Sequence, residues 1–281
     1  MDPQIIIAAP SYNPQNGGAI VLHKLCHTLN TLGIKSYLTT TPKLNGPTNY
    51  FNLNPHFNSD IANNIDLDRD IVIYPEIERG NPFGARNVVR YILSKAHLVE
   101  TSEGPHKSTW GEGDFWLYFH ELFYDKISEK NILHIIHSKS DIYHNLNIDR
   151  DTESCYTTRK NTNSQPLLNS IQINFNTPDH ELIHIFNRCK RFYSYDTETY
   201  LNVLAALCGC ESVIVPQKGK NKKDIIGKQP SFKYGIAYGV HDIPHANDTQ
   251  HLVKSHLNQL EQAQILETSN MFKKINTYFN L

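Results

Sequence analysis

The sequence predicts an α/β protein with two doubly wound parallel sheets, and three observations lead to this prediction. Short apolar runs alternate with amphipathic stretches along the chain, which is typical of strands joined by crossover helices. A Gly-rich turn separates the first apolar run from the first amphipathic stretch. The chain has 281 residues, of which 39% are hydrophobic and 20% charged. That length accommodates two compact domains of about 140 residues each.

The N-terminal part has the pattern of a β-α-β unit. Residues 5–9 are a short apolar run, which indicates a buried strand, and the turn-rich loop 10–18 follows. Between residues 21 and 32, apolar residues recur at three- and four-residue spacing, so we predict an amphipathic helix that Gly33 ends. Residues 34–39 then read as the next strand.

The rest of the first half contains a second strand signal and a helical pattern. Residues 42–69 are rich in Asn and Pro and predict an irregular excursion, whereas 70–74 form a clear buried strand. Residues 87–96 place their apolar side chains on one helical face, so a helix is expected there. The aromatic residues at 115–119 are expected in the core, and 132–136 is expected to be a strand.

The second half repeats the alternation after a polar, turn-rich segment at residues 137–152, where we place the domain boundary. The predicted strands cover 154–158, 191–195 and 212–216. The predicted helices cover 179–188, 198–207, 249–264 and 266–279. Strands that alternate with helices in both halves favour two parallel sheets.

Composition excludes several classes of function. The formal net charge of −1 argues against a nucleic-acid binder, which usually carries a strong basic field. No apolar run approaches the length of a membrane-spanning helix, and no signal peptide is recognisable. The five scattered cysteines suit buried thiols in a reducing, cytoplasmic compartment. We expect no metal site, because Cys208-Gly-Cys210 lacks a second cysteine pair at zinc spacing.

Gly17 and Gly18 are the first candidate binding residues. They lie between the first strand and its helix, where a ligand can approach the backbone and free N–H groups favour an anion. The loop is not the dinucleotide fingerprint, because the GxGxxG spacing is missing. The alternative interpretation is a tight turn without a ligand.

A second group follows two strands of the second half. Arg159 and Lys160 come directly after the strand at 154–158, and two cations there can neutralise a diphosphate. Hydroxyl and carboxyl side chains follow the strand at 191–195, where a helix is expected to begin; they belong to Tyr195, Asp196, Thr197 and Thr199. The alternatives are a solvated basic pair and simple helix capping.

Glu76 and Glu78 are the candidate catalytic residues. Both follow the buried strand at 70–74, and carboxylates at the carboxyl edge of an open α/β sheet face the crevice where ligands bind. Either could take a proton from a hydroxyl group as general base. The alternative is a pair of surface carboxylates.

Four segments together resemble the glycosyltransferases of the GT-B fold, in particular the bacterial family-4-like and rhamnosyl-type enzymes. They are Ala9-Pro-Ser-Tyr-Asn-Pro-Gln-Asn-Gly-Gly-Ala19 and the ranges 73–91, 192–216 and 234–240. The resemblance covers about two thirds of the chain. In its compactness the chain is similar to transferases encoded by large algal DNA viruses.

The resemblance implies two Rossmann-like domains that face an interdomain cleft. An acceptor domain would cover 1–148 and a nucleotide-sugar domain 149–265, and a helix at 266–281 would cross back to the first domain. Arg159 and Lys160 would bind the diphosphate. The residues lining the phosphates and ribose would be Tyr195, Asp196, Thr197 and Thr199. Gly17 and Gly18 would face the transferred sugar.

The implied activity is transfer of a sugar from a nucleotide diphosphate, with UDP-xylose as the first donor to test, to a hydroxyl of a glycan acceptor in glycan biosynthesis. Retaining relatives carry two glutamates eight positions apart, but counting on from Glu198 reaches Ala206. We therefore expect inversion, with a base from the first domain, and neither a metal nor a cofactor. A non-catalytic sugar- or nucleotide-binding module and a sugar-nucleotide epimerase remain as alternatives.

Overall fold

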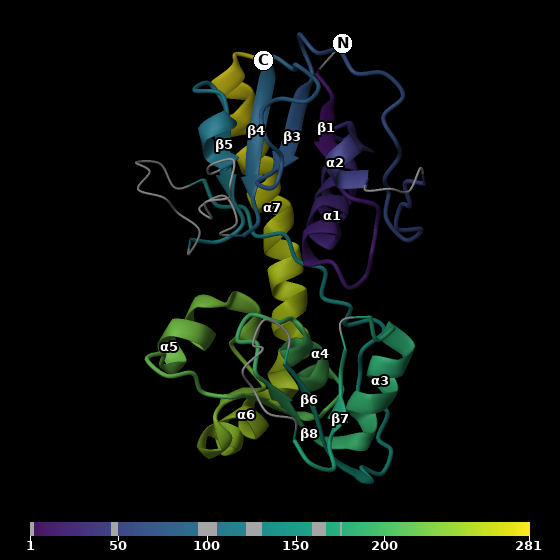
Figure 1. Ribbon diagram of the computed structural model, residues 1–281, viewed down its shortest axis with the longest axis vertical. Coiled ribbons are helices and arrows are strands. Elements are labelled where there is room, and N and C mark those ends of the chain that lie inside the picture. The colour runs from purple at the N-terminus through teal and green to yellow at the C-terminus, as the bar shows by residue number, and fades with distance from the viewer. Residues whose placement is uncertain (1–2, 46–49, 95–105, 122–130, 159–166, 175) are drawn as a thin grey trace. The chain divides into compact units, whose positions relative to one another are not determined.

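The chain folds into two compact α/β units. The computed structural model describes residues 3–45, 50–94, 106–121, 131–158, 167–174 and 176–281 (Figure 1). The first unit consists of residues 1–137 together with 262–281, and the second unit of residues 138–261. The domain limits expected from sequence lay at residues 148 and 265.

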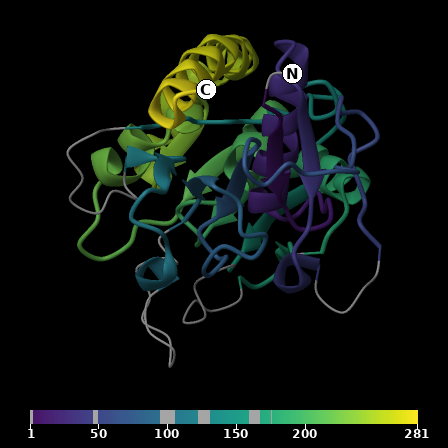
Figure 2. The same ribbon diagram turned by 90° about the horizontal axis from the view of Figure 1, so that it is seen from above.

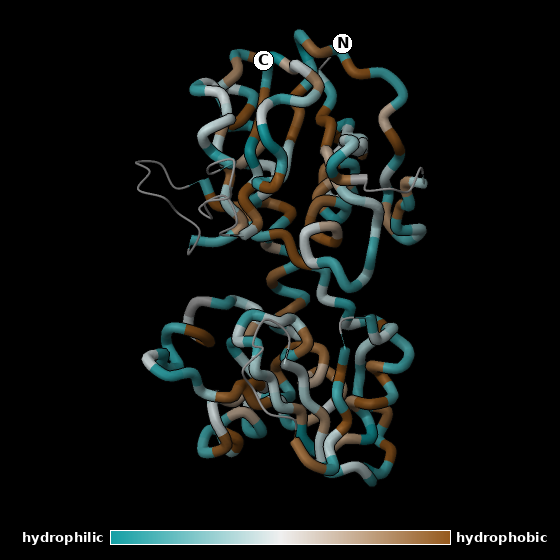
Figure 3. Tube along the Cα trace, viewed as in Figure 1, coloured by the Kyte–Doolittle hydropathy of each residue, from teal (hydrophilic) through white to brown (hydrophobic). Residues whose placement is uncertain are grey.

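The first unit is built on a parallel sheet. Its strands are β1 (Ile5–Ala8), β2 (Ser36–Thr39), β3 (Ile71–Pro75), β4 (Asn87–Ile92) and β5 (Phe115–Tyr118). Within the described residues they pair in the order β2-β1-β3-β4-β5, all parallel. Every residue of β1, β3 and β4 is buried, because both faces of a parallel sheet are covered. Figure 3 shows β1 and β3 largely in the brown of hydrophobic residues.

Two helices cover one face of the first sheet. They are α1 (Gly17–Thr31) and the last part of α7 (Val253–Phe279), purple and yellow in Figures 1 and 2. Leu22 and Leu25 of α1 join Phe272 of α7 in one hydrophobic cluster with alternate strand residues such as Ile5 and Ile7. The other face packs against the short helix α2 (Pro42–Asn45) and the segments that follow β2 and precede β4.

The second unit repeats the same strand order. Its strands are β6 (Thr152–Thr157), β7 (Ile171–Gln172), β8 (Cys189–Ser194), β9 (Glu211–Ile214) and β10 (Ile236–Tyr238). Among the residues the structure describes, they form a parallel sheet in the order β7-β6-β8-β9-β10. In both units the first strand therefore lies between the second and the third.

Helices cover both faces of the second sheet. The helices α3 (Asp179–Arg188) and α4 (Leu201–Leu207) pack on one face with the beginning of α7, and α6 (Ile243–Thr249) packs on the other. The remaining helices within the described residues of both units are short: η2 (His106–Thr109), α5 (Lys222–Ile225), η4 (Ile226–Lys228), η5 (Pro230–Phe232), η6 (Val240–Asp242) and η7 (Gln250–Leu252). In the described part of the chain, no helix combines the length and the apolar character that a bilayer crossing requires.

The helix predicted at residues 87–96 is wrong, because residues 87–92 form strand β4. The apolar side chains of β4 pack on both faces of the sheet. Val89 belongs to the cluster under α1, whereas Val88 and Ile92 point into the clusters on the opposite face. A strand buried on both sides has a near-continuous apolar sequence, which also fits a helical spacing over a few residues.

Two other predicted elements differ in extent. The strand expected at residues 132–136 is reduced to a single bridge between Ile132 and Tyr118. The C-terminal helices expected at 249–264 and 266–279 are one helix, α7, because no Gly or Pro interrupts the sequence between them.

The helix expected at residues 198–207 begins only at Leu201. Side chains before it close turns instead of capping a helix: Asp196 Oδ1 accepts a hydrogen bond from the Glu198 amide at 3.0 Å. Thr199 Oγ1 accepts one from the Leu201 amide at 3.4 Å. Polar side chains that bond to nearby backbone groups compete with helix formation in this way.

Candidate functional site

Each sheet has one place where the winding reverses, and the candidate residues that the structure describes lie at these two places. In the first unit the reversal lies between β1 and β3, and in the second between β6 and β8. In open α/β sheets, ligands bind outside the carboxyl ends of the strands at such a switch point. The two carboxyl edges are therefore where ligands are expected to bind.

The loop after β1 leads into a well-capped helix with room at its start. Asn16 Oδ1 accepts a hydrogen bond from the Ala19 amide at 3.2 Å and so caps α1. A Cβ on Gly17 would have no other group within 4 Å. On Gly18 it would lie 3.7 Å from the Leu93 side chain, just beyond the end of β4. Gly18 thus lies next to Leu93, whose amide is bound by the Glu76 carboxylate.

The carboxylate of Glu76 is buried and fully engaged. Its Oε2 accepts a hydrogen bond from the Leu93 amide at 2.9 Å, and its Oε1 accepts one from Ser94 Oγ at 2.7 Å. These bonds tie the end of β3 to the end of β4. Burial raises the pKa of Glu76 above its ordinary value, although both hydrogen bonds act in the opposite direction.

Glu78 is buried as well and ties two other segments to the same loop. Its Oε1 accepts a hydrogen bond from Thr41 Oγ1 at 2.6 Å, and its backbone oxygen accepts one from Trp110 Nε1 at 2.9 Å. The structure therefore brings Glu76 and Glu78 to the predicted edge, but as groups that already hold neighbouring parts of the chain.

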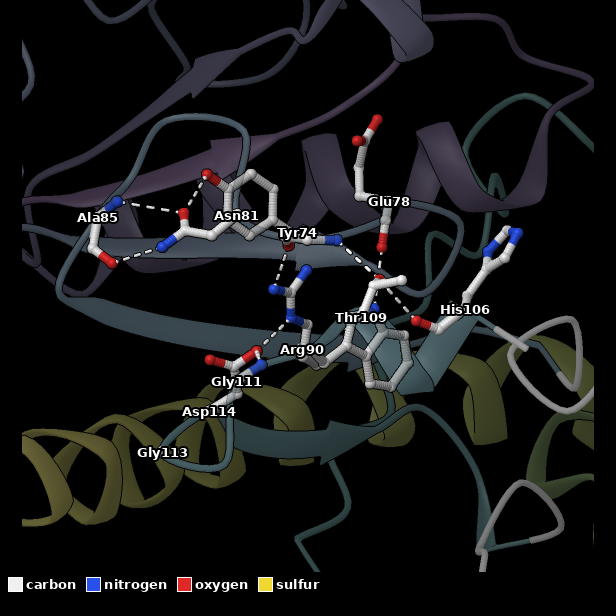
Figure 4. A network of polar contacts seen from close by, with 12 residues as sticks. Tyr74, Glu78, Asn81, Ala85, Arg90, His106, Thr109, Gly111, Gly113 and Asp114 are labelled. Carbon is white, nitrogen blue, oxygen red and sulfur yellow. Dashed lines mark hydrogen bonds and ion pairs between the residues drawn. The ribbon is translucent and has the colours of Figure 1, made fainter. Parts of the chain in front are cut away.

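A short segment around η2 clamps the loop after β3. His106 Nδ1 lies 3.2 Å from the Glu76 backbone oxygen, and Gly80 donates its amide hydrogen to Thr109 Oγ1 at 2.8 Å. Together with the bond from Trp110, these contacts reach every second residue of the loop from Glu76 to Gly80. Figure 4 shows this network, with His106 and Glu78 at one end and Ala85 at the other.

Arg90 is the centre of the network in Figure 4, and it is fully buried. Its Nε donates to Asp114 Oδ2 at 2.6 Å, and its Nη2 donates to the backbone oxygen of Gly80. The guanidinium carbon lies 5.0 Å from the ring centre of Tyr74 and 5.4 Å from that of Trp110. Paired and stacked in this way, a buried cation fixes the loops that carry the site.

The candidate residues of the second unit gather at the end of β8. The Tyr195 amide donates to the Thr157 oxygen at 3.0 Å, which extends the pairing of β8 with β6. Asp196, Thr197 and Thr199 are buried in the turns that precede α4. These four residues therefore come together at the predicted edge, in a turn instead of a helix start.

The predicted diphosphate ligands Arg159 and Lys160 lie outside the described residues. Strand β6 ends at Thr157, so both follow the carboxyl end of the strand that neighbours β8.

The sequence also contains three histidine pairs at four-residue spacing: His23/His27, His180/His184 within His-Glu-Leu-Ile-His, and His241/His245. Such pairs can bind zinc from one face of a helix. His23 is instead buried beside Phe51 with Nε2 at the Pro10 oxygen. The His180/His184 and His241/His245 pairs are exposed. Over the described ranges, no group of three or more His, Cys, Asp or Glu residues could hold a metal ion.

Sequence reasoning missed Arg90 and His106. An arginine inside an apolar run was the one available signal for Arg90, because a buried charge requires a partner. Nothing local distinguishes His106, since its role depends on a contact with Glu76, which lies far away in sequence.

No protein-family model matches the sequence, and no curated protein is significantly similar to it.

Proposed function

We propose that this chain is a glycosyltransferase of the GT-B type, which moves a sugar from a nucleotide diphosphate to a hydroxyl group of a glycan acceptor. The donor is UDP-linked in this proposal, with UDP-xylose the first to test. Transfer inverts the anomeric carbon. The GT-B arrangement, in which two Rossmann-like domains face a common cleft, is part of the proposal.

The observation that carries the proposal is the matched strand order of the two units. Both are parallel sheets whose first strand lies between the second and third, so each has one switch point. The candidate residues chosen from sequence follow the strands at these two points. An enzyme that joins two substrates must bind both, and two switch points offer one binding edge for the donor and one for the acceptor.

The second unit is proposed to bind the donor. Backbone N–H groups and hydroxyls from Tyr195 to Thr199 suit phosphate oxygens, and Arg159 and Lys160 supply the positive charge that a departing diphosphate needs. Basic residues in this role make a divalent ion unnecessary, so we expect activity to survive chelation.

The first unit is proposed to bind the acceptor and to remove its proton. The edge that carries Glu76 and Glu78 lies beside Gly18, and at the neighbouring Gly17 an added Cβ would have no other group within 4 Å, which leaves room for a sugar. The five free cysteines are all buried, which supports placing the reaction in a reducing, cytoplasmic setting.

Titration calorimetry with UDP tests the donor site. We expect Arg159→Ala to weaken binding by about 1.5–3 kcal/mol, or roughly 10- to 150-fold, because a hydrogen bond to a charged group is lost. Arg188→Ala is the matched control, since Arg188 precedes the amino end of β8 and forms an exposed ion pair with Asp151. Equal UDP affinity in both variants would contradict the assignment of Arg159.

A further inference from the structure

The imidazole of His106 is held in one defined tautomer. Its Nδ1 lies 3.2 Å from the backbone oxygen of Glu76. A carbonyl oxygen can only accept a hydrogen bond, so Nδ1 must carry the hydrogen. In the neutral ring the lone pair then lies on Nε2, which is the arrangement a proton acceptor requires.

The backbone of His106 is fixed as firmly as its ring. Thr109 Oγ1 donates to the His106 oxygen at 2.8 Å and at the same time accepts the Gly80 amide hydrogen. Trp110 Nε1, four residues on, binds the oxygen of Glu78. The segment is therefore attached at both ends to the loop after β3, and Figure 4 shows the imidazole projecting from the end of the network near Glu78.

The two carboxylates of the same edge are less suited to accept a proton. Both oxygens of Glu76 accept hydrogen bonds from the chain, and Glu78 accepts one from Thr41. Only 4% and 2% of these two residues is exposed. A hydroxyl group would have to displace an existing bond to reach Glu76. His106 is partly exposed, and its Nε2 forms no hydrogen bond with the residues that the structure describes.

We propose that His106 Nε2, and not a carboxylate, is the general base of the first unit, with Glu76 as the positioning residue that orients the ring. This assignment rests on the proposed function. The acceptor oxygen forms a bond to the anomeric carbon while the bond from that carbon to the diphosphate oxygen breaks. The hydroxyl proton passes to Nε2, and the nucleoside diphosphate leaves with the bonding electron pair. The imidazolium then releases its proton to solvent.

Release of UDP from a UDP-sugar, followed by chromatography, tests this role with water as the acceptor. We expect His106→Gln to lower kcat by about 10²- to 10⁴-fold while KM for the donor changes little, because a positioned base contributes that factor. His56→Gln makes the same chemical change at an exposed loop position and should keep the parent rate.

The pH profile separates His106 from the carboxylates. His106 contacts the loop after β3 at the Glu76 backbone oxygen, and the titratable residues of that loop are Glu76, Glu78 and Arg79, with Lys107 next to His106 in the sequence. The parent kcat should fall on the acid side, and His106→Gln should lose this limb. Glu76→Gln should keep it, because the backbone oxygen that orients His106 is unchanged. His106→Ala should regain activity with added imidazole, which a purely structural role would not allow.

The outcomes distinguish the two proposals. A parent protein that releases UDP from no UDP-sugar contradicts the transferase and, with it, the base. A parent that does release UDP, together with a His106→Gln variant within about threefold of its rate, overturns the role of His106 alone. Loss of the acid limb in Glu76→Gln but not in His106→Gln would assign the base to Glu76.

Discussion

Removing the counter-charge of Arg90 should destabilise the first unit more than any surface change. Asp114→Ala deletes the carboxylate that accepts Arg90 Nε at 2.6 Å and the Gly111 amide at 3.1 Å. Breaking a buried ion pair from one side costs about 3–5 kcal/mol, because an unpaired charge stays buried. The Arg90 side chain is 0% exposed and that of Asp114 10%. We therefore expect the lower end of the range, about 3 kcal/mol.

Tryptophan fluorescence during urea unfolding measures this loss directly. The two tryptophans of the chain, Trp110 and Trp116, stack edge to face beside Arg90, so the signal reports the first unit. With a slope of about 1–3 kcal/mol per molar urea, the midpoint should fall by about 1–3 M. Glu112→Ala removes an exposed carboxylate from the same turn and serves as the control.

Arg90→Met combined with Asp114→Ala completes the double-mutant cycle. Because the double variant buries no unpaired charge, it should be more stable than the sum of the single losses predicts. If Asp114→Ala unfolds at the same urea concentration as Glu112→Ala, the guanidinium does not depend on Asp114 and the reasoning fails.

Two further changes have defined outcomes. Burial, with a smaller contribution from His120, lowers the pKa of His134 from 6.5 to about 4, so the unfolded chain binds this proton more readily than the folded one. Stability should thus decrease as the pH falls from 6.5 towards 4, by on the order of 2–3 kcal/mol, and His134→Gln should remove that part of the urea-measured pH dependence. Gly17→Ala should leave the urea midpoint unchanged or raise it, because the added Cβ meets no other group. If the transferred sugar approaches Gly17, the same change should slow UDP release. An unchanged rate would mean that Gly17 serves only the turn before α1.

The parallel strands were predictable because their signal is local and strong. Residues 5–9 and 70–74 are short apolar runs between turn residues, and the structure places β1 and β3 there. Strand β4 was mistaken for a helix because Val88 and Val89 face opposite sides of a sheet that is buried on both. The spacing of apolar residues alone does not distinguish such a strand from a helix. Which of the two forms depends on the layers that cover both faces of the sheet.

The candidate site was only partly predictable for a related reason. The position of Glu76 follows from one rule, that residues after a buried strand lie at the carboxyl edge of the sheet. Its hydrogen bonds do not follow from that rule, because Leu93 and Ser94 reach it through the pairing of β3 with β4. His106 depends on a contact across 30 residues, and no local pattern encodes such a contact.

Proton NMR of a UDP-sugar incubated with the protein tests the central claim most directly. The account predicts that the anomeric signal of the UDP-sugar disappears as UDP and free sugar form, and that the first sugar anomer has the opposite configuration to the donor. A binding module would leave the spectrum unchanged, and an epimerase would convert one UDP-sugar into another without releasing UDP. Either result, obtained with UDP-xylose and with each other UDP-sugar tested, would contradict the proposed transferase.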